Sequence, residues 1–129
     1  RILGIETSCD ETGISLIEAN SSKYKIKTLV NLVSSQVQIH KKWGGVVPGL
    51  AKREHQKNLI PLLKEALGKV GLLKKEKNSL NTEKEKEIEG FFKKDPILLK
   101  HLREFLKNYQ KPKLDYLAVT AGPGLEPAL

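Results

Sequence analysis

Two short apolar segments of β-strand type, separated by five polar residues, are the feature that most limits what this chain can fold into. Residues 1–6 read RILGIE and residues 12–18 read TGISLIE, with apolar side chains at the close spacing of a half-buried or buried strand. The polar run from Thr7 to Glu11 is too short and too hydrophilic to continue a buried strand. A third apolar segment follows over residues 24–35. The spacing predicts three consecutive antiparallel strands.

The remaining apolar patterns predict two helices and one more strand. Residues 36–47 form a connection, and Pro48 begins a helix that runs to about Leu67, with Pro61 inside it expected to kink or split it. Residues 95–109 have helical spacing, with Asp95 as the expected cap and Pro96 as the first residue. Residues 114–120 predict a central strand parallel to the first, ended by the turn Ala121-Gly122-Pro123-Gly124.

Residues 73–112 contain a segment of different character from the rest. Positions 74–94 hold seven lysines and five glutamates, with little apolar content before Phe91. Such composition favours a solvated, mobile insert, and we do not expect it to belong to the catalytic core. Its role stays open between binding a partner, binding a nucleic acid and plain surface. The element order is then β-β-β-α-insert-β, which resembles ribonuclease H-like and actin-like domains.

Composition narrows the class of protein. The net charge of +8, from 23 basic and 15 acidic residues, suits a polyanionic partner such as nucleic acid, although solvated surface lysines give the same total. A single cysteine excludes an internal disulfide and is typical of a reducing compartment, so we expect a cytoplasmic protein. No apolar run approaches the roughly 20 residues of a membrane helix. The chain begins inside a strand pattern and lacks methionine, so we interpret residues 1–129 as an incomplete amino-terminal lobe.

The polar loop between the first two strands is the candidate chemical site. Hydroxyl side chains and free backbone amides in a hairpin loop make a nest for anions. Two neighbouring carboxylates would repel a phosphate unless a divalent cation or its bound water lies between them, or unless they accept a proton during a reaction. The other interpretation is an ordinary turn whose side chains cap backbone donors. The candidates are Thr7, Ser8, Cys9 and Thr12 for the phosphate, and Asp10 and Glu11 for catalysis.

Several single residues have competing interpretations. Cys9 is a candidate nucleophile, but no histidine is near it in sequence, and a small packed side chain fits better. Trp43 is suited to stacking on a base, yet an anchor packed beneath its loop is the preferred interpretation. The three histidines, His40, His55 and His101, lack ligand spacing. We expect His55 to be packed or hydrogen-bonded beneath the polar loop.

Four segments in the same order resemble the tRNA threonylcarbamoyladenosine transferase family, once described as O-sialoglycoprotein endopeptidases. The first is ILGIETSCDETGISL, and the second is SQVQIHKKWGGVVPGLA, with its Gly-Gly-Val-Val-Pro end. The third is the helix AKREHQKNLIPLLKEAL, and the fourth is LDYLAVTAGPGL. The resemblance covers residues 2–72 and 114–129. Protease activity has no support, because no His-Glu-x-x-His segment or nucleophile–base pair occurs.

This resemblance implies a fold and an activity. The fold is one ribonuclease H-like lobe of the actin-like ATPase (ASKHA) fold, a mixed α/β sheet with a charged helical insert. The implied reaction moves a threonylcarbamoyl group from threonylcarbamoyl-AMP to the adenosine next to the tRNA anticodon, with ATP as the other nucleotide considered. Gly122 and Gly124 would bring backbone to the same cleft as the loop. The residues expected to contact tRNA are Lys41, Lys42, Lys52 and Arg53.

The resemblance also implies groups that this sequence does not supply. A divalent metal (iron, zinc or magnesium) would be held by residues outside these 129, so we assign no metal ligand here and expect the chain alone to be inactive. The implied partners are a noncatalytic paralogue and a small ATPase. Two alternatives stay open: a noncatalytic actin-like partner subunit, and a sugar or acetate kinase of the same superfamily.

Overall fold

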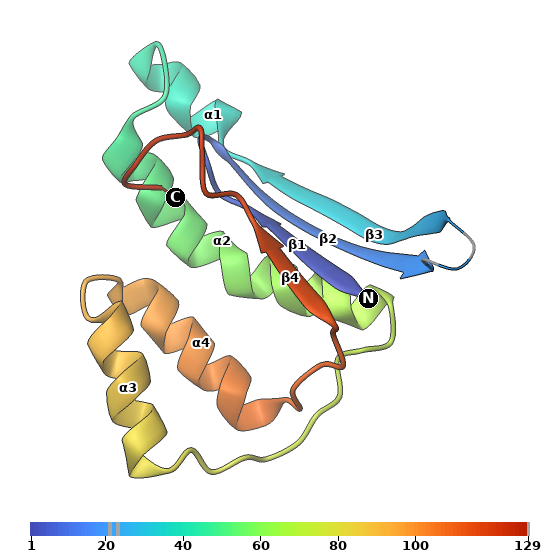
Figure 1. The fold of residues 1–129 in the computed structure, drawn as a ribbon. Coiled ribbons are helices and arrows are strands. Elements are labelled where there is room, and N and C mark those ends of the chain that lie inside the picture. Colours follow the sequence, from blue (N-terminus) through green and yellow to red (C-terminus); the bar gives the residue numbers. More distant parts are fainter. Residues whose placement is uncertain (21, 23, 129) are drawn as a thin grey trace.

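The computed structural model describes residues 1–20, 22 and 24–128. Its sheet has four strands in the order β3-β2-β1-β4 (Figure 1). β1 pairs antiparallel with β2, β2 pairs antiparallel with β3, and β4 pairs parallel with β1. The mixed sheet and the β-β-β-α-β order confirm the predicted fold class. The strand bounds are β1 Ile2–Glu6, β2 Glu11–Asn20, β3 Lys25–Ser35 and β4 Tyr116–Val119.

In Figure 1, α2 lies along the sheet, α4 and α3 lie below it, and α1 lies at the upper end of the sheet. The long helix α2 crosses one sheet face, α4 packs against α2, and α3 packs against α4. A short helix α1 and a 3₁₀ turn η2 fill the connection between β3 and α2. None of the helices in the described part of the chain is long and apolar enough to span a membrane. The bounds are α1 Val37–His40, η2 Lys41–Trp43, α2 Pro48–Lys69, α3 Thr82–Phe92 and α4 Pro96–Asn108.

Helix α2 is continuous through Pro61, so this proline does not split the helix, and the alternative of a kink stays a prediction. Pro61 removes one backbone donor, but its position on the helix is exposed. The carbonyl that loses its partner, on Lys57, also belongs to an exposed residue and can bind water instead. At the carboxyl end the Leu72 amide donates to the Leu67 carbonyl at 2.8 Å, and Gly71 has a positive φ of 69°. This is the expected glycine-assisted helix end.

Strand β4 differs in position from the prediction. Its parallel pairing with β1 is confirmed, but within the described chain it is an edge strand rather than a central one. Its side chains are exposed, with 69% of Tyr116, 67% of Leu117 and 63% of Val119 accessible. Leu117 is the register partner of buried Leu3, so it faces the same side of the sheet as the core but extends past the cover of α2.

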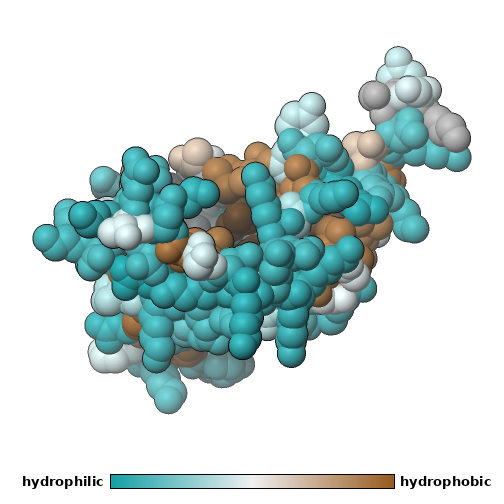
Figure 2. Space-filling model, turned by 90° about the horizontal axis from the view of Figure 1, so that it is seen from below, coloured by the Kyte–Doolittle hydropathy of each residue, from teal (hydrophilic) through white to brown (hydrophobic). Residues whose placement is uncertain are grey.

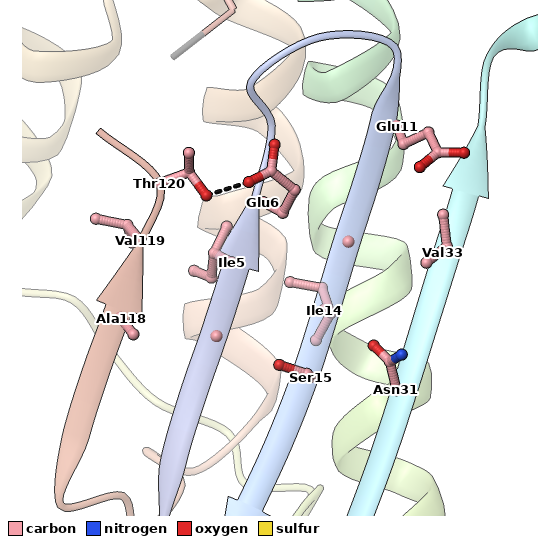
Figure 3. Close-up of a pocket in the computed structure, with 12 residues that line it drawn as sticks. Ile5, Glu6, Glu11, Ile14, Ser15, Asn31, Val33, Ala118, Val119 and Thr120 are labelled. Atoms are coloured by element: carbon pink, nitrogen blue, oxygen red, sulfur yellow. Dashed lines mark hydrogen bonds between the residues drawn. The ribbon is translucent and has the colours of Figure 1, made fainter. Parts of the chain in front are cut away.

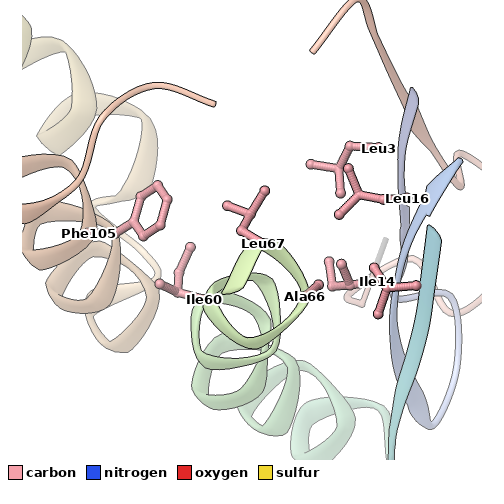
Figure 4. Packing of buried hydrophobic residues seen from close by; sticks show 8 residues of the cluster. Leu3, Ile14, Leu16, Ile60, Ala66, Leu67 and Phe105 are labelled. Carbon is pink, nitrogen blue, oxygen red and sulfur yellow. The ribbon is translucent and has the colours of Figure 1, made fainter. Parts of the chain in front are cut away.

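The hydrophobic core lies between the sheet and α2 and continues to α4 (Figure 4). The strands contribute Leu3, Ile14 and Leu16, and α2 meets them with Ala66 and Leu67. Figure 4 shows α2 between the sheet on one side and Phe105 of α4 on the other. Figure 2 shows a surface that is mainly hydrophilic, with apolar groups gathered around a hollow on the face seen from below. One buried cluster therefore joins residues from the first and the last third of the chain.

The charged insert contributes to this core through its second helix, α4, whereas positions 74–94, the part predicted to be solvated, contain no buried residue. Phe105 is 7% exposed and Leu99 is 9% exposed, whereas α3 has no buried residue. Asn81 caps α3 through its side chain, which accepts from the Lys84 amide at 2.9 Å. Asp95 is the N-cap residue of α4 and Pro96 its first residue, as predicted, but the Asp95 side chain makes no capping hydrogen bond. The Asp95 carboxylate instead accepts from Gln56 at 2.7 Å and so ties the insert to α2.

Candidate functional site

Three segments that are distant in sequence meet where β1 and β4 end. The loop of residues 7–10 follows β1, and the turn of residues 120–124 follows β4 (Figure 1). The Leu125 amide donates to the Ser8 carbonyl at 2.7 Å, which joins the turn to the loop. The Gln36 amide donates to the Asp10 carbonyl at 2.8 Å, which joins the loop to the start of α1. The structure thus brings Gly122 and Gly124 beside the polar loop.

Glu6 is the residue at this junction that sequence reasoning missed. Its carboxylate accepts from the Ser8 amide at 2.6 Å and from the Ser8 hydroxyl. It also accepts from the Thr120 hydroxyl, the bond that Figure 3 shows. Burial acts to raise the pKa of the Glu6 carboxyl, but the hydrogen bonds from Ser8 and Thr120 outweigh burial and hold this pKa below its ordinary value. The position of Glu6 directly before the polar loop is the sequence feature that could have identified it. The ionised side chain latches the loop to the end of β4.

The loop keeps backbone donors available. The Cys9 and Asp10 amides have no hydrogen-bond acceptor within the part of the chain that the structure describes, so they can bind an anion. The Ser8 hydroxyl already donates to Glu6, which leaves its oxygen as an acceptor. The Cys9 side chain is exposed, so the interpretation of Cys9 as a small packed residue is wrong. The anion-binding capacity of this loop lies mainly in its backbone.

Asp10 and Glu11 face different surroundings. The Asp10 carboxylate is half-buried and, among the described residues, has no hydrogen-bond or ion-pair partner. Glu11 begins β2 and is exposed, and it borders a hollow of about 420 Å³ on the sheet face that α2 leaves open. Figure 3 shows this hollow, which is also lined by Glu6, Thr120 and Ser15. The structure therefore separates the two expected catalytic carboxylates, one at the loop and one at the sheet face.

Thr12 and His55 lie beneath the loop. Thr12 is fully buried, and its hydroxyl is 2.8 Å from His55 Nδ1. His55 Nε2 is 3.1 Å from the Cys9 carbonyl oxygen, which confirms the interpretation of His55 as a hydrogen-bonded residue under the loop. Thr12 thus has no surface open to a phosphate, because its side chain points into the core toward α2. The prediction that Thr12 contacts the phosphate is therefore wrong, and Thr12 has a structural role beneath the loop.

Replacing Thr12 with valine, which has nearly the same shape, is expected to lower the free energy of unfolding by about 1–3 kcal/mol. The reason is that His55 Nδ1 would lose its buried hydrogen bond with the Thr12 hydroxyl. Urea unfolding followed by circular dichroism measures this change. Thr28→Val on the exposed part of β3 is the matched control and should change stability by no more than about 0.5 kcal/mol. Equal stabilities for the two variants would contradict the structural role of Thr12.

The four expected RNA-binding residues are not equivalent. Lys41 and Lys42 lie on η2 and Arg53 lies on α2, and all three are exposed without an ion-pair partner in the described part of the chain. Lys52 forms an ion pair with Asp95, with Nζ 3.0 Å from the carboxylate oxygen. Its charge is therefore partly neutralised by the insert. Three of the four remain available to a polyanion.

Trp43 ends η2 next to Lys41 and Lys42. It is 70% exposed, so the expected packed anchor is wrong. Gly44 follows with a positive φ of 74°, and this left-handed residue ends the 3₁₀ turn. The turn itself is fixed by backbone bonds, such as the Gly44 amide to the Lys41 carbonyl at 3.3 Å. The indole contributes surface rather than core.

The described residues contain no group of side chains that could bind a metal ion. Among residues 1–20, 22 and 24–128, no three His, Cys, Asp or Glu side chains are grouped so that they could hold an ion. The divalent metal that the family resemblance implies would be held by residues outside this sequence. We therefore derive no chemical step through a metal.

The comparisons with known proteins support the resemblance drawn from the motifs. The sequence model of the family "TsaD: tRNA N6-adenosine threonylcarbamoyltransferase" matches residues 27–79, from β3 through α2 into the insert. The amino-terminal region is about 50% identical to curated proteins of that name. Over this stretch the chain is similar to tRNA N6-adenosine threonylcarbamoyltransferases. The predicted family resemblance is thereby confirmed.

Three of these relatives come from different bacteria. The tRNA N6-adenosine threonylcarbamoyltransferase of Persephonella marina is 52% identical over 67 residues, covering 52% of this chain and 18% of the relative. That of Fervidobacterium nodosum is 51% identical over 71 residues, covering 55% and 19%. That of Thermus thermophilus is 49% identical over 75 residues, covering 58% and 21%. The chain spans about a fifth of the length of the curated relatives it matches.

Proposed function

We propose that this chain is part of an enzyme that transfers the threonylcarbamoyl group from threonylcarbamoyl-AMP to the exocyclic amine of the adenosine next to the tRNA anticodon. The observation that carries the proposal is the junction of loop 7–10 with the turn 120–124, which leaves the Cys9 and Asp10 amides open. It occurs in a chain about half of which is close to 50% identical to transferases of that name. Backbone amides at such a junction suit the phosphate of an adenylate.

The proposed chemistry is acyl transfer. The adenosine amine attacks the carbamoyl carbonyl carbon, the bond between that carbon and the AMP phosphate oxygen breaks, and AMP leaves with the electron pair. Asp10 is the proposed acceptor of the amine proton, because its carboxylate has no protein partner within the described chain. Glu11 is the second candidate, since it is exposed beside the open sheet face. Thr7, Ser8 and the two glycines position the phosphate.

The remaining parts of the proposal concern partners. Lys41, Lys42 and Arg53 are proposed to contact tRNA phosphates, which would make binding salt-sensitive. A noncatalytic paralogue and a small ATPase would assist the full-length protein, and a divalent metal would be bound by residues outside this sequence. A cytoplasmic location is part of the same proposal, because the substrate is tRNA.

An assay of the full-length protein tests the function directly. Incubation with threonylcarbamoyl-AMP and tRNA that lacks the modification is expected to give N6-threonylcarbamoyladenosine, measured by mass spectrometry of the digested nucleosides. The same tRNA with the target adenosine changed to guanosine is the control. Phosphorylation of a sugar or acetate by ATP, without the modified nucleoside, would instead support a kinase. Product formation only when a second, catalytic paralogue is added would assign this chain to the partner subunit.

A further inference from the structure

Beneath the candidate site lies a chain of buried polar groups that neither the sequence motifs nor the proposed chemistry explains. Gln36 is fully buried, His40 is 3% exposed and His55 is 5% exposed. Gln36 directly follows β3, His40 lies on α1 and His55 lies on α2, so this chain of polar groups joins three parts of the fold. Buried polar groups are kept only when hydrogen bonds replace the lost water. Their hydrogen bonds therefore define what this cluster does.

The partners at the two ends of the chain fix the protonation of both imidazoles. The Val47 amide can only donate, and its nitrogen is 3.2 Å from His40 Nδ1, so this ring nitrogen carries no proton. The Cys9 carbonyl can only accept, and its oxygen is 3.1 Å from His55 Nε2, so this nitrogen carries the proton. His40 is consequently neutral with its proton on Nε2, and His55 also carries a proton on Nε2. The Thr12 hydroxyl then donates to His55 Nδ1.

Gln36 connects the two rings. Its Oε1 accepts from His40 Nε2 at 2.9 Å, and this contact fixes the orientation of the amide. Its Nε2 then donates toward the Ala51 carbonyl at 3.4 Å and lies against the His55 ring, 3.3 Å from Nδ1 and 3.5 Å from Nε2. Its backbone amide holds the Asp10 carbonyl at 2.8 Å. Gln36 thus links His40 to the loop and packs against His55, which is itself bonded to the Cys9 carbonyl.

We propose that His55 and His40 are positioning residues of the candidate site, linked through Gln36, and that their neutral Nε2-protonated tautomers hold the Cys9–Asp10 backbone in place. The link to catalysis rests on the proposed function, whereas the hydrogen-bond chain does not. A second proton on His40 would place two donors, Nδ1–H and the Val47 amide, against each other. A second proton on His55 Nδ1 would turn the Thr12 hydroxyl from donor to acceptor and bring a positive charge against the Gln36 amide group, 3.3 Å away. Protonation of His40 therefore opposes the observed geometry directly, and protonation of His55 opposes it through this charge.

The charges around His55 act in both directions. Burial lowers the pKa of His55 below its ordinary value, and His40 adds to this, while the Cys9 carbonyl bond, Glu6 and Asp10 act to raise it. The net direction favours the neutral ring in the folded state, in agreement with the geometry. Between the lowered pKa and the ordinary value of about 6.5, the unfolded chain binds more protons than the folded chain. The His55 contribution to stability is therefore lost as pH falls below that value.

The decisive experiment compares two amide substitutions of His55 in the 129-residue chain and in the full-length protein. In His55→Gln the side-chain amide can replace Nε2–H and still donate to Cys9, whereas in His55→Asn it is too short and retains only an acceptor near Thr12. Hydrogen exchange of the Gln36 amide, which is bonded to Asp10, reports opening of the loop. We expect exchange on the order of tenfold faster in His55→Asn and close to wild type in His55→Gln. His101→Gln on α4 is the matched control and should match wild type.

Three further readouts separate this proposal from a merely structural one. The imidazole ¹⁵N shifts of the wild-type chain should show Nε2–H tautomers for His40 and His55 at pH 7. The loss of stability below about pH 6.5 should be smaller in His55→Gln than in wild type. In the transfer assay His55→Asn should lower kcat while the KM for tRNA stays unchanged. An Nδ1–H tautomer on either ring, or equal exchange in the Asn and Gln variants, would overturn the proposal even if the transfer activity is confirmed; absent transfer activity with the expected exchange would reject only the proposed function.

Discussion

Replacing Asp10 with alanine is expected to lower kcat for threonylcarbamoyl transfer by roughly 100- to 10,000-fold, the range for loss of a positioned proton acceptor. The fold should survive, because the Asp10 carboxylate makes no hydrogen bond or ion pair within the described part of the chain. Only its backbone carbonyl is used, as the acceptor for the Gln36 amide, and alanine retains that carbonyl. Quantification of the modified nucleoside, together with thermal unfolding of the same samples, measures both effects.

Three further variants, one of them a control, make the Asp10 result specific. Asp10→Asn keeps the shape of the side chain but cannot accept a proton as a carboxylate does, so its kcat should fall as in the alanine variant. Glu11→Gln tests the second candidate, which lies at the open sheet face. Glu87→Gln, on the exposed helix α3, is the control for loss of a negative charge and should leave the rate unchanged. A normal rate in Asp10→Asn would exclude proton transfer through Asp10.

Replacing Phe105 with alanine is expected to lower the free energy of unfolding by about 3–5 kcal/mol, the range for removal of a buried aromatic side chain. Phe105 is 7% exposed, and its ring stacks on Tyr109 with centroids 5.4 Å apart. It belongs to the same buried cluster as Ile60 and Leu67 of α2. Urea unfolding of the chain measures the loss, and the slope of the transition reports whether the insert still unfolds together with the sheet.

Phe91 is the matched control for Phe105, because it is the same residue type in the same insert but is 76% exposed. Phe91→Ala should change the free energy of unfolding by no more than about 0.5 kcal/mol. A large difference between the two variants means that α4 is part of the folded lobe although its sequence surroundings are highly charged. Similar small effects would mean that the insert is only loosely attached and that the core ends at α2.

The local pattern of apolar residues was sufficient to predict the first two strands and the long helix α2. Apolar residues in 1–6 and 12–18 predicted two strands, and both occur: β1 begins one residue later than expected, and β2 begins one residue earlier and ends two residues later. Pro48 and the apolar spacing after it predicted α2, which runs two residues past the predicted end. These predictions succeed because side-chain periodicity follows directly from backbone geometry. Pro61 does not break the helix. The free-energy cost of this proline depends on whether the Lys57 carbonyl, which loses its hydrogen bond, meets solvent, and the apolar periodicity of the sequence carries no information on that point.

The partners of polar side chains could not be predicted in the same way. Glu6 was not selected, because nothing in its neighbours shows that Thr120 would donate to it across the sheet. Asp95 was read as a helix cap from local spacing, but Gln56 and Lys52 of α2 bind its carboxylate instead. Local rules rank the partners that are near in sequence, whereas tertiary packing brings competing partners close.

The polar loop between the first two strands shows where the division lies. The sequence by itself determined that a polar loop near residues 7–11 separates two strands and carries hydroxyls and carboxylates. It also determined that the chain resembles a transferase family. Only the tertiary structure decided that Thr12 faces the core, that Asp10 and Glu11 point to different surroundings, and that Gln36 and two histidines support the loop from below. The physical reason is that residue type sets what a side chain is able to bind, while burial and the groups packed against it from distant elements select what it does bind.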